Sequence, residues 1–201
     1  MGRVRSRDGT AIAFDRLGEG PALVLVDGAL SHRSFGPLVP LADVLARDFT
    51  VVRYDRRGRG ESGDAAPYAV AREVEDLDAV LAAAGGPASV FGLSSGAALA
   101  LEAAASGSAI AKLVLYEPPF DVEADEDTAY VERLNELIAE GRHGDAVEWF
   151  LAHAGVPAEA LDRMREQPDW PAFEAVAPTG AGRPGGARRT AAGLPPLGAL
   201  W

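Results

Sequence analysis

Short, continuously apolar runs alternate along the first half of the chain with longer stretches in which apolar residues recur every three or four positions. The short runs predict β-strands and the longer stretches predict amphipathic helices. The predicted strands cover residues 22–26, 49–54, 88–91 and 111–116. The predicted helices carry the apolar positions Phe35, Leu38, Leu41 and Leu45, then Val70, Val74, Leu77 and Leu81, then an alanine-rich stretch over 97–106. This alternation predicts an α/β fold, a mostly parallel sheet flanked by helices on both faces.

The two ends of the chain depart from this alternation. Asp8-Gly9 separates two short runs, 4–7 and 11–16, and predicts a β-hairpin. Beyond Phe120 no further strand pattern follows, so residues 121–177 are predicted to form a helical lid over a core made by residues 1–120. Residues 178–201 contain no acidic residue, are dense in Gly, Ala, Pro and Arg, and are predicted to form a disordered tail.

The pentapeptide Gly92-Leu93-Ser94-Ser95-Gly96 carries the main chemical signal. It lies between the predicted strand over 88–91 and the alanine-rich helix. A G-x-S-x-G sequence at a strand-to-helix junction is typical of a sharp turn that presents the serine hydroxyl at the edge of a sheet. The flanking glycines are expected because a Cβ at either position would meet neighbouring backbone. Ser94 is therefore the candidate nucleophile.

Composition narrows the classes of partner. The net charge is −11 over 201 residues, which disfavours nucleic acid and anionic membranes as partners. The chain has no cysteine, so it forms neither a disulfide nor a thiolate metal site. The basic N-terminus is followed by no apolar signal region, and no apolar run approaches the length of a membrane span. A cytoplasmic protein is expected.

Together these motifs resemble the α/β-hydrolase fold family, in particular its small esterase and haloperoxidase-like members, over residues 2–179. The resemblance implies that Ser94 is the nucleophile and that the backbone N–H groups of Ala29 and Ser95 bind the oxyanion. It implies no cofactor and no metal. One position departs from the family, which usually has His where this chain has Asp27. The motifs that carry the resemblance are Asp27-Gly28-Ala29, residues 54–62, the serine pentapeptide and Tyr116-Glu117-Pro118-Pro119.

In this family an acid and then a histidine follow the serine, each after a later strand. The three histidines here are His32, His143 and His153, and none occupies the position of the family base. The resemblance therefore implies a chain truncated after the lid, with the last strands missing. The composition of residues 178–201 is what a frameshift in GC-rich DNA would produce, so a frameshifted hydrolase is the hypothesis.

Several residues have two interpretations. His32 or His153 is either a substitute base or an ordinary solvated or packed histidine. Glu117 is either an alternative triad acid or part of a turn that begins the lid. Residues 56–63 lack the phosphate-loop pattern and are interpreted as a tight turn held by arginine salt bridges. The pair Trp149-Phe150 either lines an acyl pocket or packs the lid.

Two functions follow from these residues. The first is a serine hydrolase that acts on an ester or related acyl substrate, impaired because no triad acid or histidine is identifiable. The second is a catalytically inactive hydrolase-like fragment or ligand-binding protein. The strand over 111–116 carries Lys112 as its only charge and would lie at a sheet edge, so self-association through this edge is also expected.

Overall fold

The computed structural model describes residues 1–119 and 128–180. The strands are β1 (Gly2–Arg5), β2 (Ala11–Leu17), β3 (Ala22–Val26), β4 (Thr50–Tyr54), β5 (Ala88–Leu93) and β6 (Ile110–Tyr116). The helices are α1 (Leu38–Leu45), α2 (Val70–Ala84), α3 (Ser95–Ala105), α4 (Thr128–Ala139), α5 (His143–His153), α6 (Ala158–Arg165) and α7 (Trp170–Gly180). Within the described ranges no helix is long and apolar enough to cross a membrane.

The six strands form one sheet in the order β1-β2-β4-β3-β5-β6. The predicted hairpin at Asp8-Gly9 is present as the antiparallel pair β1–β2, and β2 also runs antiparallel to β4. Strands β4, β3, β5 and β6 are parallel neighbours, so their carboxyl ends share one edge of the sheet. The predicted α/β class with a mostly parallel sheet is confirmed.

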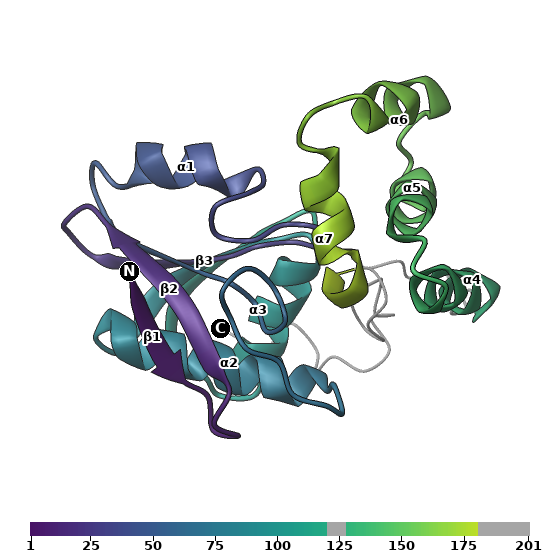
Figure 1. The fold of residues 1–201 in the computed structure, drawn as a ribbon. Helices are drawn as coiled ribbons and strands as arrows, with labels where there is room; N and C mark the ends of the chain where they lie inside the picture. Colours follow the sequence, from purple (N-terminus) through teal and green to yellow (C-terminus); the bar gives the residue numbers. More distant parts are fainter. Residues whose placement is uncertain (120–127, 181–201) are drawn as a thin grey trace.

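Helices cover both faces of the sheet, as Figure 1 shows, with α1 on one side and α2 and α3 on the other. The larger core lies under α2 and α3, where Leu77 and Leu81 pack with Val24, Val52 and Val90 of the central strands. A smaller core lies between α1 and the opposite face of the sheet. Its buried side chains are Leu23, Leu25 and Val51 of the strands and Leu38 and Ala42 of α1. The central strands are buried on both faces, which is why their sequences are continuously apolar rather than alternating.

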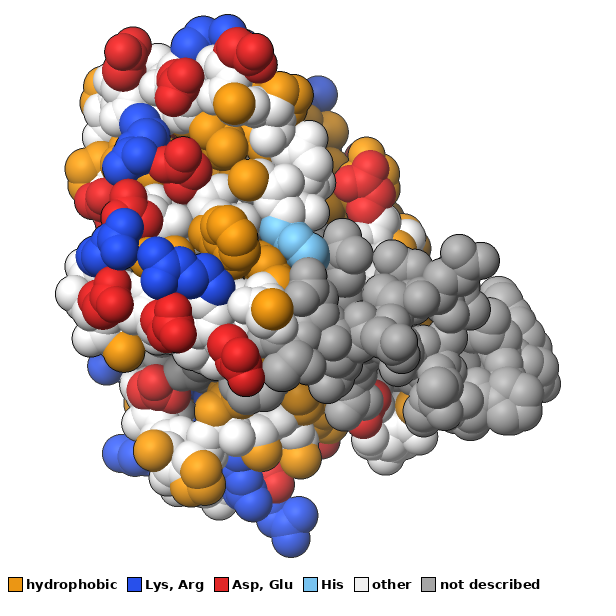
Figure 2. Space-filling view, turned by 90° about the vertical axis from the view of Figure 1, so that its right-hand side faces the viewer, with side chains coloured by type: hydrophobic (Ala, Val, Ile, Leu, Met, Phe, Trp, Pro, Cys, Tyr) orange, Lys and Arg blue, Asp and Glu red, His pale blue; other side chains and the backbone are white. Residues whose placement is uncertain are grey.

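Helices α4 to α7, called here the helical layer, stand at the carboxyl edge of the sheet (Figure 1). The sequence predicted a helical lid over 121–177, and α7 extends beyond that range: it includes Pro178 and Thr179, which the sequence assigned to the tail. The outer face of the layer carries interleaved cationic and anionic side chains (Figure 2), among them the Arg142–Asp145 pair. The remaining tail, 181–201, and the acidic stretch over 120–127 lie outside the described residues.

Strand β6 is the last strand of the sheet among the described residues. Val114 is 51% exposed and Tyr116 is 53% exposed, although both are large apolar residues. Tyr116 stacks on Phe91 of β5, which belongs to the face that α1 covers elsewhere. The described part of the chain therefore leaves this corner of the sheet open, as expected from a pattern with no strand after residue 116.

Candidate active site

Ser94 sits between β5 and α3 in a backbone conformation that few residues adopt. Its φ is 50° and its ψ is −121°. A Cβ on Gly92 would lie 2.6 Å from the Cα of Ala97, and a Cβ on Gly96 would lie 2.5 Å from the carbonyl oxygen of Asp27 and closer still to that of Val26. Both glycines of the pentapeptide are therefore required by backbone contacts, for the steric reason that the sequence suggested.

The Ser94 turn lies against the loop that follows β3. The Cβ of Ser94 is 3.4 Å from where a Cβ on Gly28 would stand, and Ala29 comes directly after Gly28. Neither the Ala29 N–H nor the Ser95 N–H donates a hydrogen bond to an acceptor among the described residues. The two predicted oxyanion donors thus flank the serine from two different segments, and both remain available to a ligand.

The loop over 27–31, called here the oxyanion loop, is held by buried polar contacts. The Ser31 hydroxyl donates to Asp27 Oδ1 at 3.0 Å, and Arg59 donates to the carbonyl oxygens of Gly28 and Ser31 at 2.6 and 3.2 Å. Leu30, in the middle of the loop, has a φ of 54°. An apolar side chain with positive φ is strained, so the surrounding contacts must hold the loop in this shape.

Asp27 stands where the resembling family usually has histidine, and its environment changes its ionisation. The residue is only 5% exposed. Burial raises the pKa of Asp27 to about 6, against the opposing effects of the Ser31 hydrogen bond and the nearby Arg59 and Arg56 charges. The carboxyl group therefore gains its charge close to neutral pH.

Arg56 links the oxyanion loop to the serine turn. One of its nitrogens, Nη1, donates to the carbonyl oxygen of Asp27 at 3.3 Å and to the Ser95 hydroxyl at 3.0 Å. Its Nε and Nη2 donate to the two carboxylate oxygens of Glu73 on α2 at 2.6 and 2.8 Å. Burial alone would raise the pKa of Glu73, but the charge and hydrogen bonds of Arg56 outweigh it and lower that pKa to about 2.

Other arginines fix the turn over residues 55–63. Arg57 is 1% exposed; it makes a two-point ion pair with Asp76 at 2.7 Å and also pairs with Asp8 at 3.0 Å. Arg33 pairs with the buried Asp55 at 3.1 Å. The interpretation of this turn as a loop held by arginine salt bridges is confirmed, and the structure adds that the bridges are buried.

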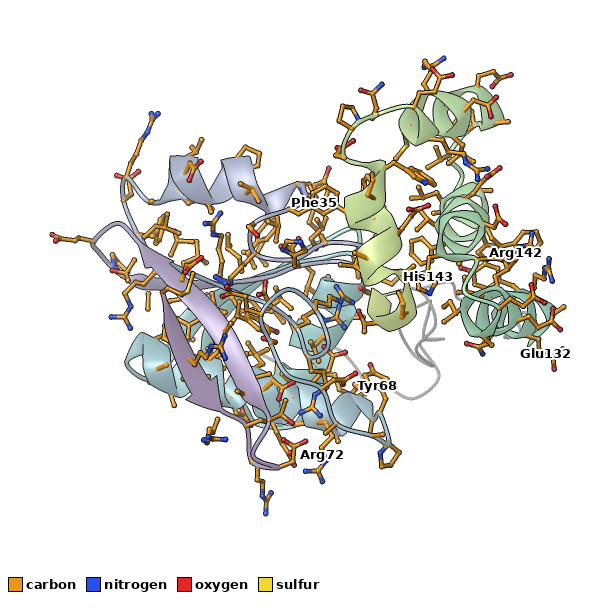
Figure 3. All side chains as sticks on the ribbon, in the orientation of Figure 1. Phe35, Tyr68, Arg72, Glu132, Arg142 and His143 are labelled. Carbon is orange, nitrogen blue, oxygen red and sulfur yellow. The ribbon has the colours of Figure 1, made fainter. Side chains whose placement is uncertain are left out.

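No histidine hydrogen-bonds to Ser94 in the described part of the chain. His32 lies near Asp55, with 4.0 Å between Nδ1 and Oδ1, and its Nδ1 is 3.1 Å from the Ser34 hydroxyl. Burial lowers the pKa of His32. His153 stacks on Tyr130 with ring centroids 3.8 Å apart, and His143 begins α5 beside α7 (Figure 3). The candidate bases are thus engaged elsewhere.

Glu117 follows β6 and lies next to the serine turn. The N–H of Ser94 donates to the carbonyl oxygen of Tyr116 at 2.9 Å, which places residue 117 directly beyond that contact. Glu117 has a φ of 48° and an exposed side chain. Its position at the carboxyl edge suits an acid, but the described residues place no histidine beside it for the acid to orient.

A cavity of about 530 Å³ is lined by residues of both the oxyanion loop and the helical layer. Ala29 lines it from the loop, and three aromatic rings line it from other elements: Phe35 (Figure 3), Phe150 of α5 and Phe173 of α7. Ser94 is not among the residues that line this cavity. Trp149 is 41% exposed, so Phe150 alone of the Trp149-Phe150 pair faces this cavity.

No group of three metal-ligating side chains is found within residues 1–119 and 128–180. The candidate groups at this site are a serine hydroxyl, two backbone N–H donors and an apolar cavity nearby. A parallel sheet with a strained serine at a strand-to-helix turn defines the class of proteins whose nucleophile is presented at the edge of the sheet.

The chain belongs to the alpha/beta hydrolase family, because the model of that family matches residues 5–201. It is similar to the crystal structure of an alpha/beta hydrolase from Sphaerobacter thermophilus DSM 20745, with 53% identity and a TM-score of 0.81. This match covers 88% of the chain and 69% of the Sphaerobacter chain.

Two other similar proteins carry different descriptions. The structure of the bottromycin epimerase BotH in complex with bottromycin A2 is 30% identical, with a TM-score of 0.65, and the match covers 94% of the chain and 75% of BotH. A probable oxidoreductase, EphD, of Mycobacterium tuberculosis is 43% identical over 84 residues, which are 39% of the chain and 14% of EphD. The chain thus spans a small part of this curated relative.

Proposed function

We propose that the chain carries the nucleophile and oxyanion half of a serine hydrolase that acts on a carboxylic ester or related acyl compound. The single observation behind this proposal is the strained Ser94 turn, flanked by the unengaged N–H groups of Ala29 and Ser95. The Ser94 oxygen would bond to the acyl carbon and the carbonyl oxygen would take the negative charge. Two aligned N–H donors lower the barrier of such a step by several kcal/mol, about 3 for one donor in known cases.

The proton of the serine hydroxyl has no acceptor at hand in the described residues. A serine without a general base is a weak nucleophile, and hydrolases stripped of triad members keep only residual catalysis. We therefore propose that turnover by this chain is slow. The negative net charge disfavours nucleic acid as a partner and so supports a small-molecule substrate. We also propose a cytoplasmic location.

A second candidate function is binding without hydrolysis. The engagement of His32 and His153 away from Ser94 favours it. So does the similarity to BotH, an epimerase whose structure holds bottromycin A2. In this case the apolar cavity beside Ala29 would bind a ligand and Ser94 would form no covalent bond.

The test compares hydrolysis of p-nitrophenyl acetate by the wild type and by Ser94→Ala. We expect equal rates, because no base is positioned. A wild-type rate larger by about a hundredfold or more would reveal a base, which His32→Ala and His153→Ala would then locate. Covalent labelling separates the two candidate functions: an alkylphosphonate ester at alkaline pH should modify the wild type at Ser94 and leave Ser94→Ala unmodified. Absence of labelling would favour binding without hydrolysis.

A further inference from the structure

One buried guanidinium touches both segments that supply the candidate oxyanion donors. Arg56 Nη1 reaches the Asp27 carbonyl oxygen, two residues before Ala29, at 3.3 Å. The same nitrogen reaches the hydroxyl of Ser95, whose own N–H is the second donor, at 3.0 Å. The two donors come from different loops, after β3 and after β5, so their spacing depends on whatever links the loops.

Arg56 is itself held rigidly. It is 4% exposed, and Glu73 on α2 binds it through two parallel hydrogen bonds. The Tyr68 hydroxyl, on the loop before α2 (Figure 3), donates to Glu73 Oε1 at 2.9 Å. A planar guanidinium fixed at two points by a carboxylate has little freedom left, so its remaining nitrogen presents hydrogens in a defined direction.

We propose that Arg56 is a positioning residue that sets the distance between the Ala29 and Ser95 N–H groups by bridging the Asp27 carbonyl and the Ser95 hydroxyl. This inference rests on the proposed function, because it assigns the two N–H groups to one acyl oxygen. It goes beyond that function by naming the residue that makes the two donors act together. Arg56 touches no reacting atom and acts only through these two segments.

The neighbouring Arg57 is a matched control. It is equally buried, and it also binds a carboxylate of α2 through two hydrogen bonds, here Asp76. Its other hydrogen bonds go to Asp8 and to the carbonyl oxygen of Arg72, so it donates to neither the oxyanion loop nor the serine turn. Loss of either arginine breaks a comparable buried ion pair, but only loss of Arg56 should disturb the donors.

The variants remove each ion pair as a unit so that no buried carboxylate is left alone. They are Arg56→Met with Glu73→Gln, and Arg57→Met with Asp76→Asn. Ser95→Ala is a third variant, which keeps every charge and the backbone N–H and removes only the hydroxyl that Arg56 binds. This third variant keeps the proposal testable if a double variant does not fold.

The first measurement does not require Ser94 to react. Amide resonances of Ala29 and Ser95 in ¹⁵N-labelled protein should both shift in the Arg56 double variant, the Ala29 resonance should shift in Ser95→Ala, and neither should shift in the Arg57 double variant. Equal shifts in the Arg56 and Arg57 variants, or no shift in the first two, would overturn the proposal even if Ser94 proves unreactive.

The second readout is the rate of phosphonylation by a p-nitrophenyl alkylphosphonate at alkaline pH. In this step the Ser94 oxygen–phosphorus bond forms, the phosphorus–aryloxide bond breaks, p-nitrophenolate leaves and hydroxide takes the serine proton. Loss of a whole oxyanion donor costs about a hundredfold or more, so misplacement in the Arg56 variant should slow labelling by about tenfold relative to the Arg57 variant. Equal rates would overturn the proposal, whereas no labelling of the wild type would overturn the proposed function instead.

Discussion

The two sides of the Ser94 turn are enclosed in different ways. On the side of β3 and β4, the oxyanion loop is bound by buried arginines, and each of its shaping contacts has a named partner. On the side of β6, the described chain ends the sheet with exposed Val114 and Tyr116. Under the proposed function, binding an acyl oxygen and removing the serine proton would depend on separate parts of this fold, and the comparison teaches that the described residues build the first part more completely.

The largest expected effect is on stability, on the side of the Ser94 turn that faces β3 and β4. Gly96→Ala should lower the free energy of unfolding by roughly 3 kcal/mol, because its Cβ would collide with the carbonyl oxygens of Val26 and Asp27. Gly63→Ala is the control, since its Cβ would meet only ordinary contacts at 3.4 Å and beyond. Urea unfolding of both variants measures the difference. Equal losses would mean that the close approach of α3 to β3 is easily relaxed.

A second effect tests the ionisation of Asp27 in the same region. A carboxyl whose pKa is raised by folding keeps its proton in the folded state while the unfolded state has lost it, so stability falls as the pH rises from about 4 to about 6. Asp27→Asn removes this loss. Relative to the wild type, the variant should therefore gain roughly 2 to 3 kcal/mol between these pH values, an upper figure from the pKa difference.

Urea unfolding of wild type and Asp27→Asn at a series of pH values gives this difference directly. The exposed Asp43 on α1 supplies the matched Asp→Asn control. Glu73 acts in the opposite sense, because its pKa is lowered to about 2 and its contribution is lost as the pH falls below about 4.5. Glu73 is present in both the wild type and Asp27→Asn, so its contribution cancels in the difference between their free energies of unfolding. A gap between wild type and Asp27→Asn that does not change with pH would contradict the prediction.

The smallest expected effect concerns the open side. We propose that the wild type self-associates at micromolar concentration through β6, whose unpaired edge and exposed Val114 and Tyr116 favour pairing with another chain. Val114→Lys should shift the protein toward monomer in sedimentation velocity. Val44→Lys, at a valine 55% exposed on α1, is the control and should leave the distribution unchanged. A wild type that sediments as a single monomeric species would contradict the prediction.

Much of the fold could be predicted from apolar patterning, because the strands of a doubly covered sheet must be continuously apolar. The end of helix α7 could not, because Pro178 lies there and marks the start of the predicted tail. Buried contacts of Val176 and Ala177 hold this end in the helical layer. Tertiary packing overrode the local signal there.

The glycines and the serine turn were also visible in the sequence, because local sterics demand them. The acidic partners of the arginines, Glu73 and Asp76 of α2, were not predicted. Both are buried beside the apolar stripe of that helix. A charged residue next to such a stripe is a local sign that it is buried and paired with an opposite charge from another segment.

Leu30 has a consequence for how the molecule responds to its ligands. It is at once the strained residue beside Ala29 and a buried member of the core of the helical layer, together with Leu134 and Trp170. Leu30 therefore joins the peptide that carries the Ala29 N–H to the packing of those helices. A ligand that shifted the helices through Leu30 would also, by reciprocity, bind with an affinity that depends on whether the candidate oxyanion site is filled, by the same factor in both directions.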